Sequence, residues 1–147
     1  ALPISSFHGV QNLASILTAD TFADTTLSVS ASTARQISCV GISRAGKTIG
    51  AMLWYGADVP TSSLEWDSLN LTIRGLAMDD PVFVEPVAGR VYEIPVLRGC
   101  KGPDYIKFHN FPLWDCPVFV MERNALDLGS STVTVQAPGS SFKDMLY

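Results

Sequence analysis

The hydrophobic and polar residues of this chain alternate with a period of two over most of its length. Residues 27–31 and 69–74 alternate strictly, which is typical of strands with one solvated face. Six further segments are mainly apolar and short, and we expect a strand in each: 36–42, 48–55, 81–86, 90–95, 117–123 and 131–136. Short turns and nine prolines separate these segments. The pattern therefore predicts an all-β fold, a sandwich or a barrel.

The N-terminal segment departs from this period. Residues 11–23 place Leu13, Ile16 and Leu17 at helical spacing, which predicts one helix. Residues 98–115 are rich in glycine, proline and aromatic residues, and we expect a long ordered loop there. The 147 residues are enough for one domain. The prediction is a single domain over 1–147, with its helix at 11–23 and its sheets within 25–136.

One stretch, GISRAGKT at residues 41–48, fits the phosphate-loop pattern G-x-x-x-x-G-K-[ST]. In a phosphate loop, Lys47 would reach the outer phosphates and Thr48 would hold magnesium. A helix must follow such a loop, but the segment that follows has two glycines and ends at Pro60 without a polar face at helical spacing. We therefore favour a β-hairpin with strands at 36–43 and 48–55. Gly46 would take a positive φ in its turn, and Arg44 and Lys47 would be solvated turn charges.

Charged residues are scarce, at 16% of the chain against roughly 25% in typical soluble domains. Such a surface is typical of a secreted protein or of one that docks against another surface. The net charge of −4 argues against a nucleic-acid partner. No apolar run is long enough to span a membrane. We therefore expect an extracellular protein that binds neither nucleic acid nor membrane.

The sequence predicts no catalytic residues, no metal site and no cofactor. The serine-hydrolase motif G-x-S-x-G is absent, and most acidic residues stand beside turn residues, where they have ordinary capping roles. There is no C-x-x-C pair for zinc. Of the three cysteines, Cys39 lies in an apolar strand pattern, and we expect a small hydrophobic residue there. Cys100 and Cys116 bracket the predicted loop, and a disulfide between them is one possibility in an oxidising compartment.

Aromatic residues offer the best binding chemistry in this sequence. Their rings present flat apolar faces with polar edges, which suit ring-shaped ligands such as sugars. Four candidates for carbohydrate-binding platforms are Trp66, Tyr92, Tyr105 and Trp114. The alternative for each is that the ring fixes a loop to the core. Trp54 and Phe83, inside apolar runs, are expected in the core.

The order of these segments resembles a known family. QNLASILTADTFADTT, RAGKTIGAMLWYG, LNLTIRGLAMDDPVFVEPVAGRVYEIP and FHNFPLWDCPVFVMERNALDL follow one another over residues 11–128. In this order they resemble the C-terminal β-sandwich domain that follows the catalytic barrel in glycoside hydrolases such as those of families 39 and 5. The resemblance implies an antiparallel β-sandwich of about eight strands with one N-terminal helix. It also implies an accessory role, because such domains usually lack catalytic residues.

Three functions stay open on this basis. The first is a non-catalytic module that binds a polysaccharide or oligosaccharide, or that supports the (β/α)8 barrel of a glycoside hydrolase of which this chain is a fragment. The second is a structural or interaction β-sandwich without a small ligand, such as a surface or capsid protein. The third is a small hydrolase or a phosphate-loop nucleotide-binding protein, which requires a helix after Lys47 in the nucleotide case.

Overall fold

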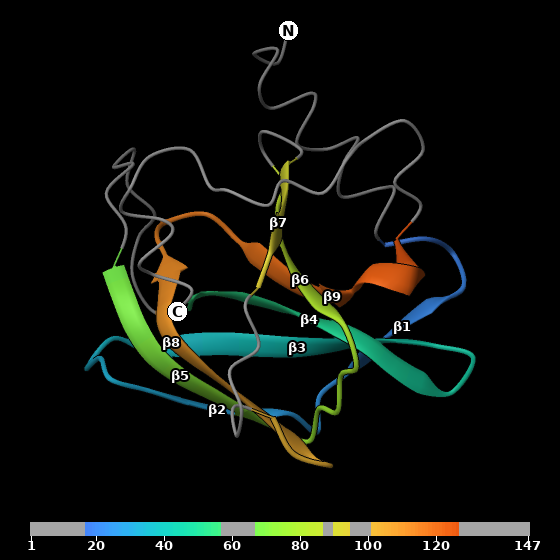
Figure 1. Ribbon diagram of the computed structural model, residues 1–147, viewed down its shortest axis with the longest axis horizontal. Coiled ribbons are helices and arrows are strands. Elements are labelled where there is room, and N and C mark those ends of the chain that lie inside the picture. Colours follow the sequence, from blue (N-terminus) through green and yellow to red (C-terminus); the bar gives the residue numbers. More distant parts are fainter. Residues whose placement is uncertain (1–16, 57–66, 87–89, 95–100, 127–147) are drawn as a thin grey trace, which may run out of the picture.

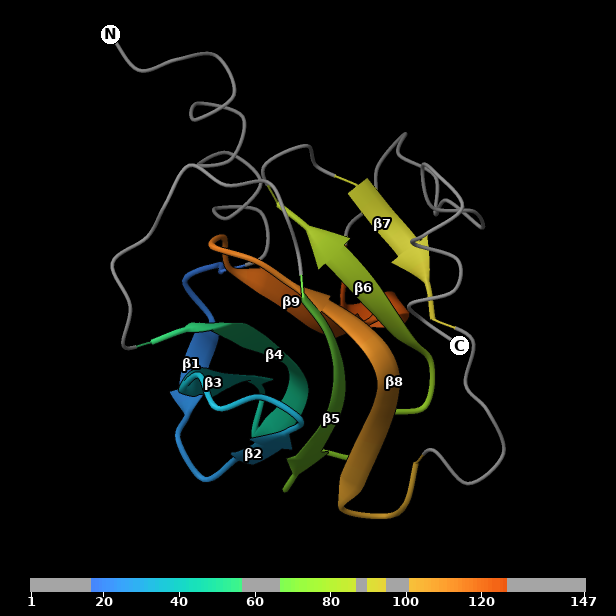
Figure 2. The same ribbon diagram turned by 90° about the vertical axis from the view of Figure 1, so that its left-hand side faces the viewer.

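The computed structural model describes residues 17–56, 67–86, 90–94 and 101–126, and most of these residues lie in antiparallel β-sheets (Figures 1 and 2). The described elements, in chain order, are β1 (Thr21–Asp24), β2 (Ser28–Ala31), β3 (Ile37–Arg44), β4 (Lys47–Tyr55), β5 (Asp67–Arg74), β6 (Pro81–Glu85), β7 (Arg90–Glu93), β8 (Tyr105–Leu113), β9 (Val118–Glu122) and the 3-10 helix η1 (Arg123–Ala125). The expectation of an all-β fold is confirmed for this part of the chain.

The strands form two sheets. The larger sheet has six strands in the order β1-β3-β4-β9-β6-β7, and the smaller has three in the order β2-β5-β8. Every strand pair in both sheets is antiparallel. Strands β2, β5 and β8, which are far apart in the sequence, lie side by side in the small sheet (Figure 1). We call these the large sheet and the small sheet below.

The larger hydrophobic core takes side chains from both sheets. Phe83 on β6 and Phe111 on β8 are fully buried in it, and their rings meet edge to face with centroids 5.5 Å apart. A second cluster of buried residues comes from alternate positions of the large sheet: Ile42, Ile49, Val82, Val84, Val91, Phe119 and Met121. Because neighbouring residues of a strand point to opposite faces, Val82 and Val84 lie on the face opposite Phe83. The large sheet is therefore apolar on both faces.

The stretch that fits the phosphate-loop pattern is a β-hairpin. Its strands are β3 and β4, which pair from Arg44 and Lys47 to Ile37 and Tyr55 with one register shift between Ile42 and Ser43. The two turn residues, Ala45 and Gly46, have φ values of 53° and 77°. Two consecutive positive φ values are the signature of the type I′ turn, which matches the twist of paired strands. The prediction of a hairpin with a positive φ at Gly46 is confirmed, and a strand begins at Lys47 where a phosphate loop needs a helix.

The predicted helix at 11–23 is wrong over the part that is described. Residues 17–20 form a bend and a turn, and Thr21–Asp24 is strand β1, paired with β3. The amide of Thr21 donates a hydrogen bond to the carbonyl of Thr18 at 3.1 Å, which closes the turn before the strand. Pairing with β3 satisfies the backbone of β1, and it outweighs the weak helical spacing of a few apolar residues. Residues 11–16 lie outside the described residues.

The predicted loop at 98–115 is also wrong where it is described, because Tyr105–Leu113 is the strand β8. Ile106 and Phe108 are buried and alternate with exposed Lys107 and His109, as a half-buried strand requires. The alternation then changes phase: Leu69 pairs with Phe111, but Leu71 pairs with Phe108. One extra residue in β8 therefore makes a β-bulge, which hides the period of two in the sequence.

The other expected strands follow the predicted segments closely. Strands β2, β3, β4, β5, β6, β7 and β9 all fall on segments predicted as strands, while 131–136 lies outside the described residues. Phe83 is in the core as expected, whereas Trp54 is only half-buried, between buried Leu53 and Tyr55. In the part of the chain that the structure describes, no helix has the length and apolar character that crossing a membrane requires.

Candidate functional site

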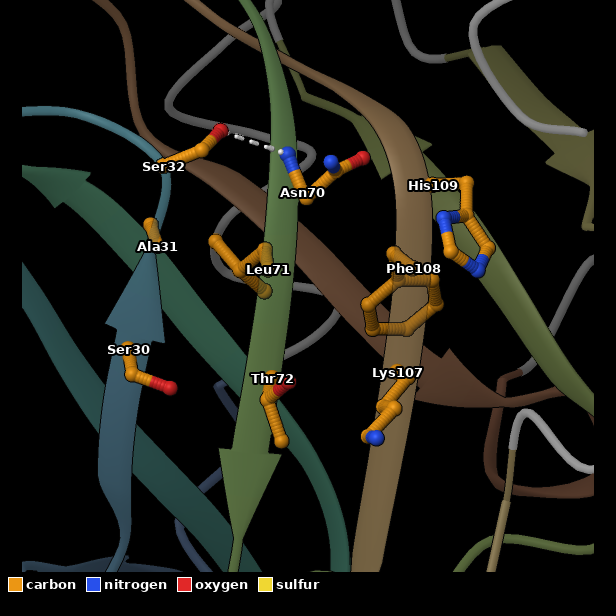
Figure 3. Close-up of a pocket in the computed structure, with 9 residues that line it drawn as sticks. All are labelled: Ser30, Ala31, Ser32, Asn70, Leu71, Thr72, Lys107, Phe108 and His109. Carbon is orange, nitrogen blue, oxygen red and sulfur yellow. Dashed lines mark hydrogen bonds between the residues drawn. The ribbon is translucent and has the colours of Figure 1, made fainter.

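A groove of about 340 Å³ lies on the small sheet (Figure 3). Nine residues from β2, β5, β8 and the residue after β2 line it: Ser30, Ala31, Ser32, Asn70, Leu71, Thr72, Lys107, Phe108 and His109. Leu71 and Phe108 are buried members of the larger core, so their side chains belong to the opposite side of the sheet. The serine, threonine, asparagine, lysine and histidine side chains are left to form the surface of the groove. They offer hydroxyl, amide and cationic groups to a ligand.

The strand register arranges these polar side chains in rows. Ser30 pairs with Thr72, and Thr72 pairs with Lys107, so one row crosses all three strands. A second row consists of Ser28, Arg74 and Tyr105. Because side chains two positions apart share a face, we define the outer face of the small sheet by nine residues: Ser28, Ser30, Ser32, Asn70, Thr72, Arg74, Tyr105, Lys107 and His109.

A pair of hydrogen bonds fixes one end of this face. The amide of Ser32 donates to the carbonyl of Asn70 at 3.0 Å, and the amide of Asn70 donates to Oγ of Ser32 at 3.0 Å (Figure 3). The hydroxyl of Ser32 is an acceptor in this bond, so its own proton can still be donated to a ligand. The backbone contacts hold Ser32 beside β5, although it lies beyond the last residue of β2.

Tyr105 is the predicted platform that the structure places on this face. Ile106, the residue after Tyr105, forms an isolated β-bridge with Lys101. The amide of Gly102 donates a hydrogen bond to the carbonyl of Tyr105 at 2.9 Å. A side chain at Gly102 would collide with the Tyr105 ring, so the ring lies directly on the glycine backbone. Lys107 lies near the same ring, with Nζ 6.0 Å from its centroid. Tyr105 therefore stands half-buried at one edge of the outer face, beside a cation.

Two of the other predicted platforms are buried and do not join it. Tyr92 is 4% exposed and Trp114 is 8% exposed, and both belong to the larger core. Their burial favours the alternative role, in which the ring fixes a loop or strand to the core. Trp66 lies outside the described residues. Of the described candidates, Tyr105 is therefore the one that the structure places on the outer face of the small sheet, in the row next to the one through Lys107.

Gly41 and Thr48, which fit the phosphate-loop pattern, have structural explanations here. A side chain at Gly41 would approach Cβ of Asp24 and Cδ1 of Leu27 to 2.9 Å, so the close contact with β1 and the segment after it requires glycine. Thr48 donates its hydroxyl to Oδ2 of Asp24 at 3.1 Å. The same carboxylate accepts bonds from the amide and the hydroxyl of Thr26, at 2.9 Å and 2.6 Å. The Thr26 hydroxyl in particular holds the pKa of Asp24 below its usual range.

The prediction that Arg44 is a solvated turn charge is wrong. Its Nη1 donates to the carbonyl of Ala125 in η1 at 3.2 Å, and its Nε lies 3.4 Å from a carboxylate oxygen of Asp20. The guanidinium therefore joins the end of β3 to the segment before β1 and to η1. Lys47, in contrast, is exposed as predicted. Arg44 differs from Lys47 because it contacts Asp20, just before β1, and Ala125, in η1. Neither β1 nor η1 was predicted from the sequence.

The two cysteines in the described part of the chain, Cys39 and Cys116, give no sign of a reactive thiol. Cys39 is half-buried against the larger core, and burial raises its pKa to about 11. Burial also raises the pKa of Cys116. A raised pKa leaves little thiolate near neutral pH. Both thiols are free in the structure, and Cys100 lies outside the described residues, so the Cys100–Cys116 disulfide stays a prediction.

Arginines also hold carboxylates together at two places away from the groove. Cζ of Arg35 lies 3.5 Å from the centroid of the Tyr55 ring, and Nη2 of Arg35 lies 3.2 Å from Oδ1 of Asp115. The Tyr55 hydroxyl donates a hydrogen bond to Oδ2 of Asp67 at 2.6 Å. Burial, followed by the bond to Asp67, raises the pKa of Tyr55. Tyr55 belongs to the large sheet and Asp67 to the small sheet, so this group ties the two sheets together.

The second arginine group ties η1 to β6 and β7. Arg123 donates to Asp80 at 2.8 Å and also pairs with Glu93, and these carboxylates raise the pKa of the guanidinium, Glu93 most strongly. Carboxylates held by arginine are satisfied by a cation from the protein itself. Within the described ranges, no group of three or more histidine, cysteine, aspartate or glutamate residues could hold a metal ion.

Sequence reasoning missed most of the groove. It singled out aromatic residues, whereas the surface consists mainly of hydroxyl, amide and cationic side chains. The signal was present in the two alternating segments 27–31 and 69–74, whose polar positions form two of the three columns of this face. What could not be found was their adjacency, because the third column lies in β8, the strand that was expected to be a loop.

Comparisons with known proteins provide no further guide to the site. A scan against models of protein families, a search of curated proteins and a search of solved structures each returned no match. The resemblance to the accessory domain of glycoside hydrolases therefore stays a prediction, and the function has to be argued from the outer face of the small sheet.

Proposed function

We propose that this chain is a non-catalytic, carbohydrate-associated β-sandwich module that binds a polysaccharide or oligosaccharide on the outer face of the small sheet. The proposal rests chiefly on one observation: a groove lined by hydroxyl, amide and cationic groups in rows, with Tyr105 in the next row of the same sheet face. Sugar hydroxyls both donate and accept hydrogen bonds, so they match serine, threonine and asparagine side chains. The sandwich itself is part of the proposal, and the larger core shared by both sheets supports it.

The chemistry of such a site is binding without bond breakage. An aromatic ring at the edge covers the apolar face of one sugar, and the rows of polar groups bond to its neighbours. A shallow groove buries little area, so we expect modest affinity. The half-buried thiols of Cys39 and Cys116, whose pKa values are raised, and the arginine-held carboxylates are consistent with this role.

Affinity electrophoresis against β-glucans, xylans and mannans tests the proposal. Tyr105→Ala should weaken binding about threefold to tenfold, because it removes an aromatic contact. Phe22→Ala is the matched control: Phe22 is 68% exposed on β1, in the other sheet, and its loss should leave binding unchanged. Since Tyr105 also packs on Gly102, Thr72→Val serves as a second variant that removes one hydroxyl from the centre of the face. Retardation by none of the polymers, or equal loss in both aromatic variants, would overturn the proposal.

The structural or interaction role is the second candidate, and one observation favours it. Leu17 and Phe22 are 43% and 68% exposed, and they are the large hydrophobic residues left exposed in the described part of the chain. Phe22 stands on β1, at one edge of the large sheet as described. Exposed apolar side chains suit contact with a protein surface, including the (β/α)8 barrel of a glycoside hydrolase. Analytical ultracentrifugation tests self-association: Phe22→Ser should shift an oligomer towards monomer, and a wild type that is monomeric throughout would contradict contact between copies.

An extracellular location is also part of the proposal. The low content of charged residues supports it, and it permits a disulfide between Cys100 and Cys116. Counting the reactive thiols of the unfolded, unreduced protein tests this point. One thiol supports the disulfide, and three thiols contradict it.

A further inference from the structure

The outer face of the small sheet differs in charge from the rest of this acidic chain. The protein carries a net charge of −4, yet the nine residues of this face include two cations, Arg74 and Lys107, and no carboxylate. The imidazole of His109 also lies at the groove (Figure 3). The flanking carboxylates are Asp104, in the turn before Tyr105, and Asp67, at the opposite end of β5.

Neither cation on this face has an acidic partner among the described residues. Arg35, Arg44 and Arg123 each pair with a carboxylate in the same part of the chain. Arg74 and Lys107 form no such pair there, although both stand on exposed positions of regular strands. These two charges are therefore available to solvent, whereas carboxylates hold the guanidinium groups of Arg35, Arg44 and Arg123.

The strand register places these charges close together. Arg74 lies opposite Tyr105, and Lys107 lies opposite Thr72 on the same pair of strands. They are therefore diagonal neighbours on one face, about 7–8 Å apart at the backbone. Hydroxyl groups of Ser28, Ser30 and Thr72 continue both rows across the sheet. One ligand can meet both cations and this set of hydroxyls together.

We propose that this face binds an acidic polysaccharide, one whose sugar rings carry carboxylates. This inference rests on the proposed carbohydrate-binding function and names the class of its ligand. Arg74 forms paired hydrogen bonds to a carboxylate, which the planar guanidinium group favours, and Lys107 attracts a second one as a point charge. The serine and threonine hydroxyls bond to the ring hydroxyls between them. Tyr105 covers the apolar side of a ring next to Lys107.

A matched pair of polymers tests the inference. Polygalacturonate and its fully methyl-esterified form have the same backbone, but only the first carries free carboxylates. Affinity electrophoresis should show retardation by polygalacturonate at least about tenfold stronger than by the ester, as expected for hydrogen bonds to a charged group. Raising sodium chloride from about 0.05 M to about 0.3 M should reduce this difference, since exposed charges are screened.

Charge-removing variants locate the interaction. Arg74→Gln and Lys107→Gln should each reduce the preference for polygalacturonate about tenfold. Lys47→Gln removes an equally exposed charge from the β3–β4 turn and is the matched control, which should leave the preference unchanged. Thermal unfolding should be the same for all three variants, because the side chains are exposed.

The outcomes separate the two proposals. If the ester binds as tightly as polygalacturonate, the acidic ligand is wrong while carbohydrate binding stands. If no polymer, neutral or acidic, retards the protein, both fail. If single-stranded DNA competes as well as polygalacturonate, the face responds to negative charge alone, and the assignment of an acidic polysaccharide is overturned.

Discussion

In strands β2 and β5 of the small sheet, apolar side chains occupy only the positions that face the larger core, whereas the large sheet has buried apolar side chains on both faces. Strand β5 shows the first pattern, with buried Leu69, Leu71 and Ile73 alternating with more exposed polar residues. Strand β6 shows the second, since Pro81 to Val84 are all buried. A strand that alternates in this way leaves one face free for a ligand, and a strand that does not is packed on both sides.

This difference explains where we place the function. A polar face presented by regular strands is rigid, so its side chains stand at spacings set by the sheet. The large sheet has no comparable face among its described central strands, because Ile42, Val82 and Phe119 occupy the corresponding positions. The binding proposal therefore concerns the small sheet, and the large sheet supplies stability.

The strongest test of the comparison is to remove a large side chain from each face of the large sheet. Phe83 and Phe119 are both fully buried, Phe83 in the larger core and Phe119 in the second cluster. Phe83→Ala and Phe119→Ala should each lower the free energy of unfolding by about 3–5 kcal/mol, through lost apolar contact and a residual cavity. Urea unfolding followed by fluorescence measures both. A loss below about 1 kcal/mol for Phe119→Ala would show that the second face is not core-like.

A smaller effect is expected at the edge of the large sheet, where polar contacts hold β1. The hydrogen bonds from Thr26 and Thr48 hold the pKa of Asp24 below its ordinary value of 3.8. A depressed pKa contributes stability above the unfolded-state value, and this stability is lost as the pH falls through the folded-state value. Asp24→Asn should therefore destabilise the protein at pH 7 by about 1 kcal/mol, and less at acid pH.

Thermal unfolding of the wild type and Asp24→Asn, measured at pH 7 and again below the ordinary aspartate pKa, checks this prediction. The gap between the two melting temperatures should narrow on acidification. An unchanged difference between the two melting temperatures would mean that the charge of the Asp24 carboxylate does not stabilise its contact with Thr48 of β4.

The smallest effect is expected on the outer face of the small sheet. Thr72→Val keeps the β-branched shape and removes only a hydroxyl at a position that is not buried. The free energy of unfolding should change by no more than about 0.5 kcal/mol, as for most surface substitutions. Urea unfolding checks this value beside the two phenylalanine variants. A loss approaching theirs would remove the distinction between a binding face and a packed face.

Strand positions could largely be read from the sequence, because the period of two depends only on which side chains prefer water. The β3–β4 hairpin was equally accessible: Gly46 suits a positive φ, and the apolar runs on both sides fix its length. Strand β8 was missed because a bulge changes the phase of its alternation and because Pro112 stands inside it. Strand β1 was missed because the helical spacing of Leu13, Ile16 and Leu17 led to a predicted helix that ran on to residue 23, and only the pairing with β3 favours the strand.

The sequence by itself determined that this is a β protein, where most of its strands lie, and that GISRAGKT is a turn between two of them. These properties are local, since they depend on residues within a few positions of one another. Only the tertiary structure decided that β2, β5 and β8 share a sheet. It also decided that Tyr92 and Trp114 are buried, while Tyr105 reaches the surface. Within the described chain, it placed Arg74 and Lys107 without a carboxylate partner on one polar face. Those properties arise from pairings between residues far apart in the sequence, and no local pattern records which distant strand becomes a neighbour.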